Sequence, residues 1–451
     1  MPGKSESDLP VISRWDVLRN RQQIFKNPLP FHRENFQKFG DSFRVKVGMP
    51  NGVIFTRNPK IIRHILQKNH RKYQKSKLQT VDLAKYIGRG LLTSNGEHWR
   101  VHRRMIQPAF HKKNLAGLFK IMDLAIQEEL RRINVNVKEE ADVFPLMGDL
   151  AFQVVAKSLF SRSDIREPMK RLQEITQRNQ RMLIREMRQP YLNWWFKLSG
   201  MISKHLKQSE QARNILNKII EERIISGGDK NDLLDMLLEA RYEDGTPMPR
   251  RQLIDEVMIL FTAGHETTAN ALSFTLYFLA KDKQVQEKVY GEVADLDLQQ
   301  DSFTDQFKKL SYTQCCIEES LRLYPPAYII DREAVEDDEI DDLFLAKDSL
   351  VLMSVFELHR YREFWIDPEQ YRPERFLEIL PKEYANYYYP FGAGPRMCIG
   401  NNFAMYEMLL TIARIVSKYK IDTPLSEIEI NPMITLKPRK MPIRFSLREK
   451  G

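Results

Sequence analysis

The chain has 451 residues, and its 70 lysines and arginines exceed its 60 aspartates and glutamates, which gives a net charge of +10. A hydrophobic content of 42% excludes a disordered protein, and the length allows one large domain or two or three smaller ones. Only 3 cysteines exclude a disulfide-stabilised scaffold and favour a reducing compartment, so we expect a cytoplasmic protein.

The N-terminal region contains short elements and no apolar segment of the kind found in secretory signal peptides. Asp41 to Phe55 alternates β-branched residues around Pro50-Asn51-Gly52, which predicts a hairpin. From about Gly96 to Leu279 the pattern is helical almost throughout. Ser311 followed by Gln314 predicts a capping box at the start of a further helix.

The most apolar long window, Val257 to Ala280, carries His265 and Glu266 near its middle. A bilayer would penalise such groups at its centre, so we expect a long buried helix here rather than a membrane span. No other stretch is expected to reach the apolar length that a span needs.

The chain changes character after Pro326. Tyr328 to Val355 predicts short strands, a turn-rich stretch runs from Phe364 to Phe391, and a last helix from about Asn402 to Tyr419. The sequence therefore predicts a mainly α protein with a small β-rich part (α+β). The β-rich part is expected at roughly 35–80 and as strands within 328–355.

A single cysteine, Cys398, lies in the glycine-rich segment Phe391 to Gly400 and directly before the last helix. The free N–H groups and the dipole of a helix N-terminus favour a thiolate, and Arg396 is expected to project a cation nearby. No second cysteine or histidine follows at zinc spacing, so the thiolate suits one axial bond to an iron. A buried structural cysteine in a tight turn is the alternative.

This segment resembles the heme-binding signature of the cytochrome P-450 family, F-x-x-G-x-R-x-C-x-G. Phe391, Gly394, Arg396, Cys398 and Gly400 meet every fixed position. The resemblance implies a heme b cofactor, iron protoporphyrin IX, with Cys398 as the metal ligand and with Phe391 and Arg396 among the cofactor-binding residues. It also implies the P-450 fold over residues 1–451, as a single heme domain with a long central helix over the heme and no fused reductase, similar to soluble bacterial members.

Two further motifs bear on the cysteine side of the heme. Glu319 to Arg322 matches E-x-x-R, and Tyr371 to Phe376 resembles F-x-P-E-R-F with Tyr in the first place. The resemblance implies a buried network of Glu319, Arg322 and Arg375. Taken alone, Glu and Arg three residues apart are more often a surface pair on a helix.

Ala263 to Thr268 matches the A-G-x-(D/E)-T-T motif on the family's central helix. The small Ala263 and Gly264 would let a flat ligand approach the helix backbone. Glu266 and Thr267 offer an acid and an alcohol side by side, which suits proton delivery to a bound dioxygen. A solvated capping segment is the alternative, and the apolar flanks argue against it.

Trp99 and Arg103 match the family's W-x-x-x-R, and Arg332 follows the Pro325-Pro326 break. The resemblance implies that these three residues bind the heme propionates, for which the arginine fork is well suited. Arg100 and Arg104 lie on another face of the same helix.

The resemblance implies a monooxygenase that inserts one oxygen atom of O2 into a C–H bond, by hydroxylation or by oxidative O- or N-demethylation. A ferredoxin or flavodoxin with its reductase is the expected electron donor, docked on a basic face. The residues proposed for that face are Arg100, Arg104, Lys112 and Lys113. We expect a monomer without a membrane span or bound nucleic acid. A peroxygenase or a heme-thiolate isomerase of the same fold, and a non-enzymatic sensor, are the alternatives.

The substrate stays open among a fatty acid, a terpenoid, a methylated sugar and an aromatic ether. The fatty-acid hydroxylases that the chain resembles hold the substrate carboxylate with an arginine and a tyrosine on the first hairpin. Gly52 to Phe55 offers neither, so a fatty acid is disfavoured. The residues expected to line the pocket are Leu78 to Leu92, Met258 to Thr262 and Ala327 to Ile330.

Overall fold

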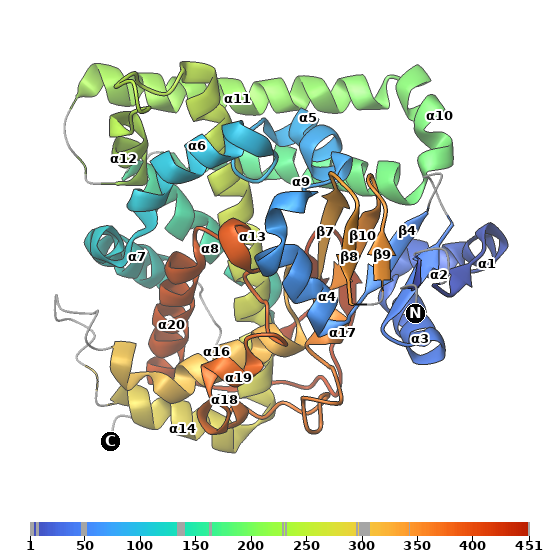
Figure 1. The fold of residues 1–451 in the computed structure, drawn as a ribbon. Coiled ribbons are helices and arrows are strands. Elements are labelled where there is room, and N and C mark those ends of the chain that lie inside the picture. Colours follow the sequence, from blue (N-terminus) through green and yellow to red (C-terminus); the bar gives the residue numbers. More distant parts are fainter. Residues whose placement is uncertain are drawn as a thin grey trace.

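The computed structural model describes residues 4–5, 9–46, 52–132, 140–161, 165–227, 230, 232–294, 296, 307–341 and 343–449. A helical body fills one side of the molecule, and the largest sheet lies beside it together with the N-terminal helices (Figure 1). This is the mainly α, α+β architecture that the sequence predicts.

Helices make up most of the described chain. They are α1 (Arg14–Arg19), α2 (Arg21–Lys26), α3 (Leu29–Phe39), α4 (Pro59–Arg63), α5 (Ala84–Ile87), α6 (Gly96–Ile106), α7 (Lys112–Arg132), α8 (Val143–Phe160), α9 (Arg166–Arg188), α10 (Asn193–Leu198), α11 (Met201–Ser226), α12 (Leu233–Glu239), α13 (Arg250–Lys281), α14 (Lys283–Ala294), α16 (Ser311–Leu323), α17 (Val355–Leu358), α18 (Arg375–Glu378), α19 (Pro381–Tyr384) and α20 (Asn401–Lys418). Short π turns are η2 (His64–Lys68) and η4 (Leu78–Leu83). Short 3₁₀ turns are η3 (His70–Lys72), η5 (Gln107–Phe110), η6 (Pro190–Leu192), η7 (Phe307–Lys309) and η8 (Gly394–Arg396).

The strands form four small sheets among the described residues. One has the order β2-β3-β4-β10-β7-β5, and the others are β1-β9-β8, β11-β14-β6 and β12-β13. Their bounds are β1 (Lys4–Ser5), β2 (Val11–Ile12), β3 (Ser42–Val45), β4 (Val53–Thr56), β5 (Tyr73–Gln74), β6 (Glu140–Asp142), β7 (Ile329–Ala334), β8 (Asp338–Ile340), β9 (Leu343–Leu345), β10 (Leu350–Ser354), β11 (Tyr419–Asp422), β12 (Ile430–Pro432), β13 (Leu436–Pro438) and β14 (Pro442–Leu447).

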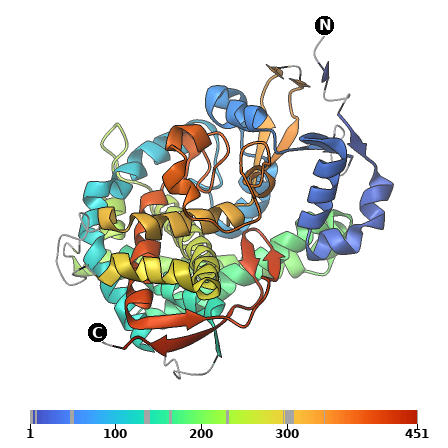
Figure 2. The ribbon, with the colours of Figure 1, turned by 90° about the horizontal axis from the view of Figure 1, so that it is seen from below.

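The predicted hairpin is confirmed as the antiparallel pair β3–β4, in which Ser42 lies opposite Thr56. Its predicted turn at Pro50-Asn51 lies outside the described residues. The predicted strands within 328–355 are β7 to β10. The strands after residue 419 were not expected; Figure 2 shows β11 and β14 at the edge opposite the N-terminal elements.

The central element is α13, whose 32 residues include the predicted long buried helix. It packs against α8, α16, α20 and α11 (Figure 1). Most of its side chains between Leu253 and Ala280 are buried. Its apolar residues join the main hydrophobic core with those of α8 and α20, which holds the helix in the middle of the molecule.

The expectation that no stretch other than Val257 to Ala280 reaches the apolar length of a membrane span is wrong. By length and composition alone, α8 is apolar enough to cross a membrane. In the structure 67% of this helix is buried inside the protein, where it packs between α7 and α13. An apolar helix that is covered by neighbouring helices on most sides is a core element of the fold.

The predicted capping box at Ser311 is also wrong. The helix does begin at Ser311, but Gln314 donates to Glu318 instead of returning to the helix start. The carboxylate of Glu292, from α14, accepts the N–H groups of Tyr312 at 2.7 Å and Thr313 at 2.8 Å. A carboxylate from a neighbouring helix satisfies the free N–H groups and matches the positive end of the helix dipole.

Candidate active site

The loop that carries Cys398 is closed by its own backbone. The N–H of Cys398 donates to the carbonyl of Phe391 at 2.9 Å, and the N–H of Met397 donates to that of Gly394 at 3.0 Å. Gly394 has φ +68°, and a Cβ there would lie 1.9 Å from the carbonyl oxygen of Leu66. Only glycine allows η8 to lie this close to η2. α20 begins at Asn401, so Cys398 lies just before its N-terminus, as predicted.

The thiol of Cys398 is exposed, although its surroundings desolvate it. Burial raises the pKa of the thiol, and the N–H of Gly400 and the charge of Arg103 act in the opposite direction without outweighing it. The expected preference for a thiolate is thus not achieved by the helix N-terminus alone, and a cation bound at the sulfur would provide it.

The cation beside the sulfur is Arg103, not Arg396 as expected. Nη1 of Arg103 donates to the carbonyl of Met397 at 2.9 Å. Arg396 donates to the carbonyl of Ser94 at 2.9 Å, and its guanidinium carbon lies 4.1 Å from the ring centre of Trp99. The guanidinium of Arg396 therefore contacts α6 and the residues just before it.

Four basic side chains, those of Lys75, Arg103, Arg332 and Arg396, gather near this loop. Lys75 is only 8% exposed, and its Nζ donates to the carbonyl of Leu92 at 2.5 Å. Its pKa lies well below the usual range, because burial and then the charges of Arg332 and Arg396 disfavour the ammonium, and Arg103 adds to the effect. Asp331 opposes this, but it also accepts from the N–H of Ser76.

This basic cluster (Lys75, Arg103, Arg332 and Arg396), of which Lys75 and Arg332 are buried, suits a ligand that carries carboxylates. The two propionates of heme have that chemistry, so the residues present fit the cofactor that the sequence implies. Sequence reasoning missed Lys75, which lies in no recognisable motif.

One face of α13 is open although the helix is central. On this face Ala263 is exposed, and Leu260, Gly264 and Thr267 are half-buried. The other residues between Met258 and Thr262 are buried. The spacing of three and four residues defines one helix face. Of the residues from Met258 to Thr262 that were expected to line the pocket, only Leu260 therefore lies on this face. Gly264 mainly serves helix packing, since a Cβ there would lie 3.3 Å from Cγ2 of Val155 on α8.

The acid and the alcohol of α13 point to different surroundings. The hydroxyl of Thr267 donates to the carbonyl of Ala263 at 2.9 Å and lies on the open face. Glu266 is buried and pairs with Lys437 of β13 at 2.9 Å, and it accepts a hydrogen bond from Thr435. Burial acts to raise the pKa of Glu266, but Lys437 and Thr435 outweigh it and hold the pKa below its usual range.

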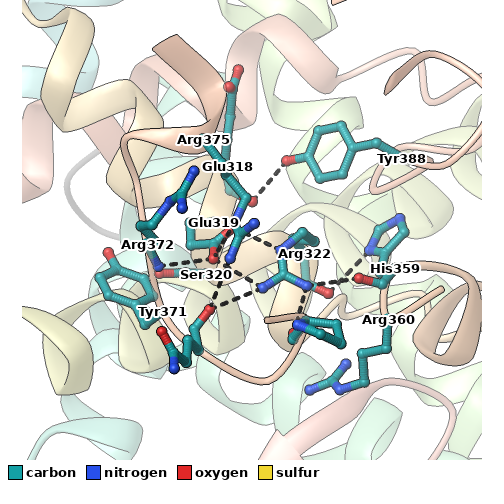
Figure 3. A network of polar contacts seen from close by, with 12 residues as sticks. Glu318, Glu319, Ser320, Arg322, His359, Arg360, Tyr371, Arg372, Arg375 and Tyr388 are labelled. Carbon is teal, nitrogen blue, oxygen red and sulfur yellow. Dashed lines mark hydrogen bonds and ion pairs between the residues drawn. The ribbon is translucent and has the colours of Figure 1, made fainter. Parts of the chain in front are cut away.

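Glu319, Arg322 and Arg375 form the buried network that the resemblance implies (Figure 3). Glu319 accepts from Nε of Arg322 at 2.7 Å and from Nε of Arg375 at 2.9 Å. All three side chains are at most 1% exposed. Arg322 also donates to the carbonyl of His359 at 2.7 Å and to that of Pro368 at 2.8 Å.

His359 links this network to the cysteine loop. Its Nε2 accepts the N–H of Tyr389 at 2.8 Å, so its Nδ1 carries the proton that bonds to the carbonyl of Arg322 at 3.1 Å. Tyr389 in turn accepts the N–H of Gly392 at 3.1 Å. Figure 3 shows His359 beside Arg322 in this arrangement. Sequence reasoning missed His359, which no motif singles out.

The comparisons agree with this geometry. The sequence profile of the family described as "Cytochrome P450" matches residues 9–445. "Cyclooctat-9-en-7-ol 5-monooxygenase" of Streptomyces melanosporofaciens is 30% identical over 433 residues, covering 93% of this chain and 89% of that protein. "Putative cytochrome P450 132" of Mycobacterium tuberculosis (strain ATCC 25618 / H37Rv) is 29% identical, covering 85% of each chain.

The fold is shared with solved structures as well. The crystal structure of the cytochrome P450DA heme domain has a TM-score of 0.85 at 22% identity and covers 100% of this chain and 99% of that one. The fold, the cysteine loop and the matching profile lead to one conclusion: the chain belongs to the cytochrome P450 family and is a heme-dependent monooxygenase.

Proposed function

We propose that the protein hydroxylates a C–H bond of a mainly apolar, uncharged substrate, with heme b bound through Cys398. The open face of α13 carries this proposal. Leu260 and Ala263 are the exposed or half-buried apolar side chains there, and Ala327 is exposed at the start of the segment that leads into β7. The open face, as described, presents no charged side chain. Such a wall binds apolar groups and leaves a charged group without a partner.

Bound at Cys398, heme supplies the activation of dioxygen, which no side chain can perform alone. The cluster of Lys75, Arg103, Arg332 and Arg396 would hold its propionates, with Trp99 stacked on Arg396. Ala263 would let the ring approach the α13 backbone. Thr267, on the same face, would position a proton at its hydroxyl, and Glu266 would be the acid that exchanges protons with it.

Among the substrate classes considered, a terpenoid fits this wall better than a fatty acid or a methylated sugar. The Streptomyces relative is named as a monooxygenase of cyclooctat-9-en-7-ol, an uncharged alcohol, which supports an uncharged substrate. The test is a spectral binding titration with neutral alicyclic alcohols and with carboxylates of the same skeleton. We expect the neutral compounds to bind at least ~10-fold more tightly. Equal affinities would contradict the proposal.

Ligation by Cys398 has a separate test. Cys398→Ser should remove the red-shifted Soret band of the reduced carbon monoxide adduct that marks a thiolate ligand. A variant that kept this band would show that another group holds the iron. The matched control is Cys316→Ser, since Cys316 is a free, buried cysteine on α16.

We propose further that electrons arrive from a separate acidic protein, a ferredoxin or flavodoxin, at a face that includes Lys112 and Lys113. Both are exposed at the start of α7, and among the described residues neither has an ion pair. Phe110, two residues earlier, is the nearest contact of a Cβ built at Gly400. Arg100 and Arg104 are weaker candidates because Glu97 and Glu243 neutralise them.

Charge reversal tests this face. Lys112→Glu with Lys113→Glu should slow reduction by an acidic ferredoxin by about 10-fold at low salt, and the difference should shrink as salt is added. Lys204→Glu, at an exposed lysine on α11, is the control. Reduction at the wild-type rate would contradict this docking face. We also propose that the protein is a cytoplasmic monomer. Its free Cys315 and Cys316 suit a reducing compartment.

A further inference from the structure

The carboxylate of Glu266 contacts strand β13 and the residue just before it, both far in the sequence from the family motif on α13. Its Oε2 lies 2.9 Å from Nζ of Lys437, and its Oε1 accepts from the hydroxyl of Thr435. Thr435 also accepts a hydrogen bond from Nδ2 of Asn270, one turn further along α13, at 3.1 Å. Each carboxylate oxygen of Glu266 thus contacts a side chain from the segment that includes β13.

The donors on this strand are fixed by backbone contacts. The N–H of Met433 donates to the carbonyl of Thr435 at 2.9 Å, and the N–H of Leu436 donates to that of Pro326 at 2.9 Å. The hydroxyl of Tyr328 donates to the carbonyl of Met433 at 2.8 Å. Leu436 is fully buried, so the strand cannot shift without disturbing the core. Thr435 and Lys437 are therefore presented to Glu266 in a set position.

We propose that Lys437 and Thr435 form a clamp that holds Glu266 as an ionised carboxylate turned away from the open face of α13. Glu266 must then leave this clamp to meet Thr267. Lys437 is a positioning residue in this scheme, since it acts through Glu266 and touches neither substrate nor cofactor. The inference rests on the proposed role of Glu266 in proton delivery.

The charges that face Glu266 favour the ionised form. Lys437 is the nearest cation, with its side chain only 18% exposed, so solvent screens the pair weakly. His265, the neighbour on α13, is buried, and its pKa is lowered because burial disfavours the imidazolium. Removal of Lys437 would leave a buried carboxyl group with only hydroxyl donors, and burial would then raise its pKa.

Infrared spectroscopy of the heme-loaded full chain tests the clamp directly. A protonated carboxyl group gives a C=O band that an ionised one lacks. We expect no such band from Glu266 in the wild type near pH 7, a new band in Lys437→Met, and its loss in Lys437→Met with Glu266→Gln. Lys437→Arg should look like the wild type, and so should Lys440→Met at an exposed lysine on the same segment. A Lys437→Met protein without a new band would overturn the clamp.

The pH dependence of coupling gives a second measurement. Coupling is the fraction of electrons that end in product rather than in hydrogen peroxide. It should be nearly flat between about pH 6 and 8 in the wild type and in Lys437→Arg, and should titrate within that range in Lys437→Met. Thr435→Val should shift the profile in the same direction by less. Identical profiles in Lys437→Met and the wild type would contradict the inference.

Glu266→Gln separates the two proposals. If this variant couples electrons to product as well as the wild type does, the proposed role of Glu266 in proton delivery fails. The infrared result would still decide whether Lys437 holds the carboxylate ionised.

Discussion

The stability of the protein in mild acid should depend on His359. Burial, and then the charge of Arg322, lower the pKa of this imidazole to about 3, from 6.5 in an unfolded chain. Its protonation therefore favours the unfolded state, and the stability that neutral His359 gives is lost as the pH falls below 6.5. At pH 5 the loss is ~2 kcal/mol, whereas at pH 7 it is close to zero.

The perturbation is His359→Gln. The glutamine oxygen can accept the N–H of Tyr389 in place of Nε2, but the residue does not titrate. The variant should be less stable than the wild type at pH 7, because the carbonyl of Arg322 loses the donor at 3.1 Å. Between pH 7 and pH 5 this difference should shrink by ~2 kcal/mol, since only the wild type must keep a buried imidazole neutral.

The assay is urea unfolding of the heme-loaded protein, followed by circular dichroism at both pH values. Buried His32 titrates in both proteins, so its contribution cancels. His111→Gln, at an exposed histidine, controls for the removal of an imidazole as such. A stability difference between the wild type and His359→Gln that stays constant from pH 7 to pH 5 would refute the reasoning.

Three further outcomes follow from the same contacts. Gly394→Ala should lower the free energy of unfolding by more than ~2 kcal/mol in urea titrations because of its φ of +68° and the Leu66 oxygen, whereas Gly400→Ala should change it by less than ~1 kcal/mol. Glu319→Gln should cost ~3–5 kcal/mol in the same assay, since it leaves two buried guanidinium groups without their carboxylate. Lys75→Met should speed the loss of heme to an acceptor protein, because it removes a proposed partner of the propionates. It should also raise the melting temperature of the heme-free chain, because it removes a buried amino group whose charged form is disfavoured by burial and by neighbouring cations.

The features that the sequence predicts well are local ones. The cysteine loop and the Glu319–Arg322 pair lie within motifs that span a few residues, so sequence spacing indicates both, although only the resemblance implied that the pair is buried. The hairpin β3–β4 follows from an alternating pattern, and the long helix α13 follows from the most apolar window of the chain. These parts needed no knowledge of how distant segments pack.

The polar contacts that the sequence missed depend on distant segments. The N-terminus of α16 is satisfied by Glu292 of another helix rather than by Ser311. Lys75 enters the cationic cluster from a segment with no motif, and Lys437 reaches Glu266 across about 170 residues. Each of these polar groups is positioned by tertiary packing, which neither propensity nor periodicity encodes.

The two sides of the site differ in how firmly they are held, and the difference matches what each must do. On the cysteine side, Arg322 and Arg375 share Glu319 and also donate to several backbone carbonyls, so any movement would expose buried charges. A cysteine that would ligate iron requires such rigidity. On the other side, Glu266 is held by Lys437 of the short strand β13 and by the hydroxyl of Thr435, just before that strand. A carboxylate that must alternate between two partners requires a hold that can be released, and the two side-chain contacts of Glu266 are fewer to break than the contacts of the network around Glu319.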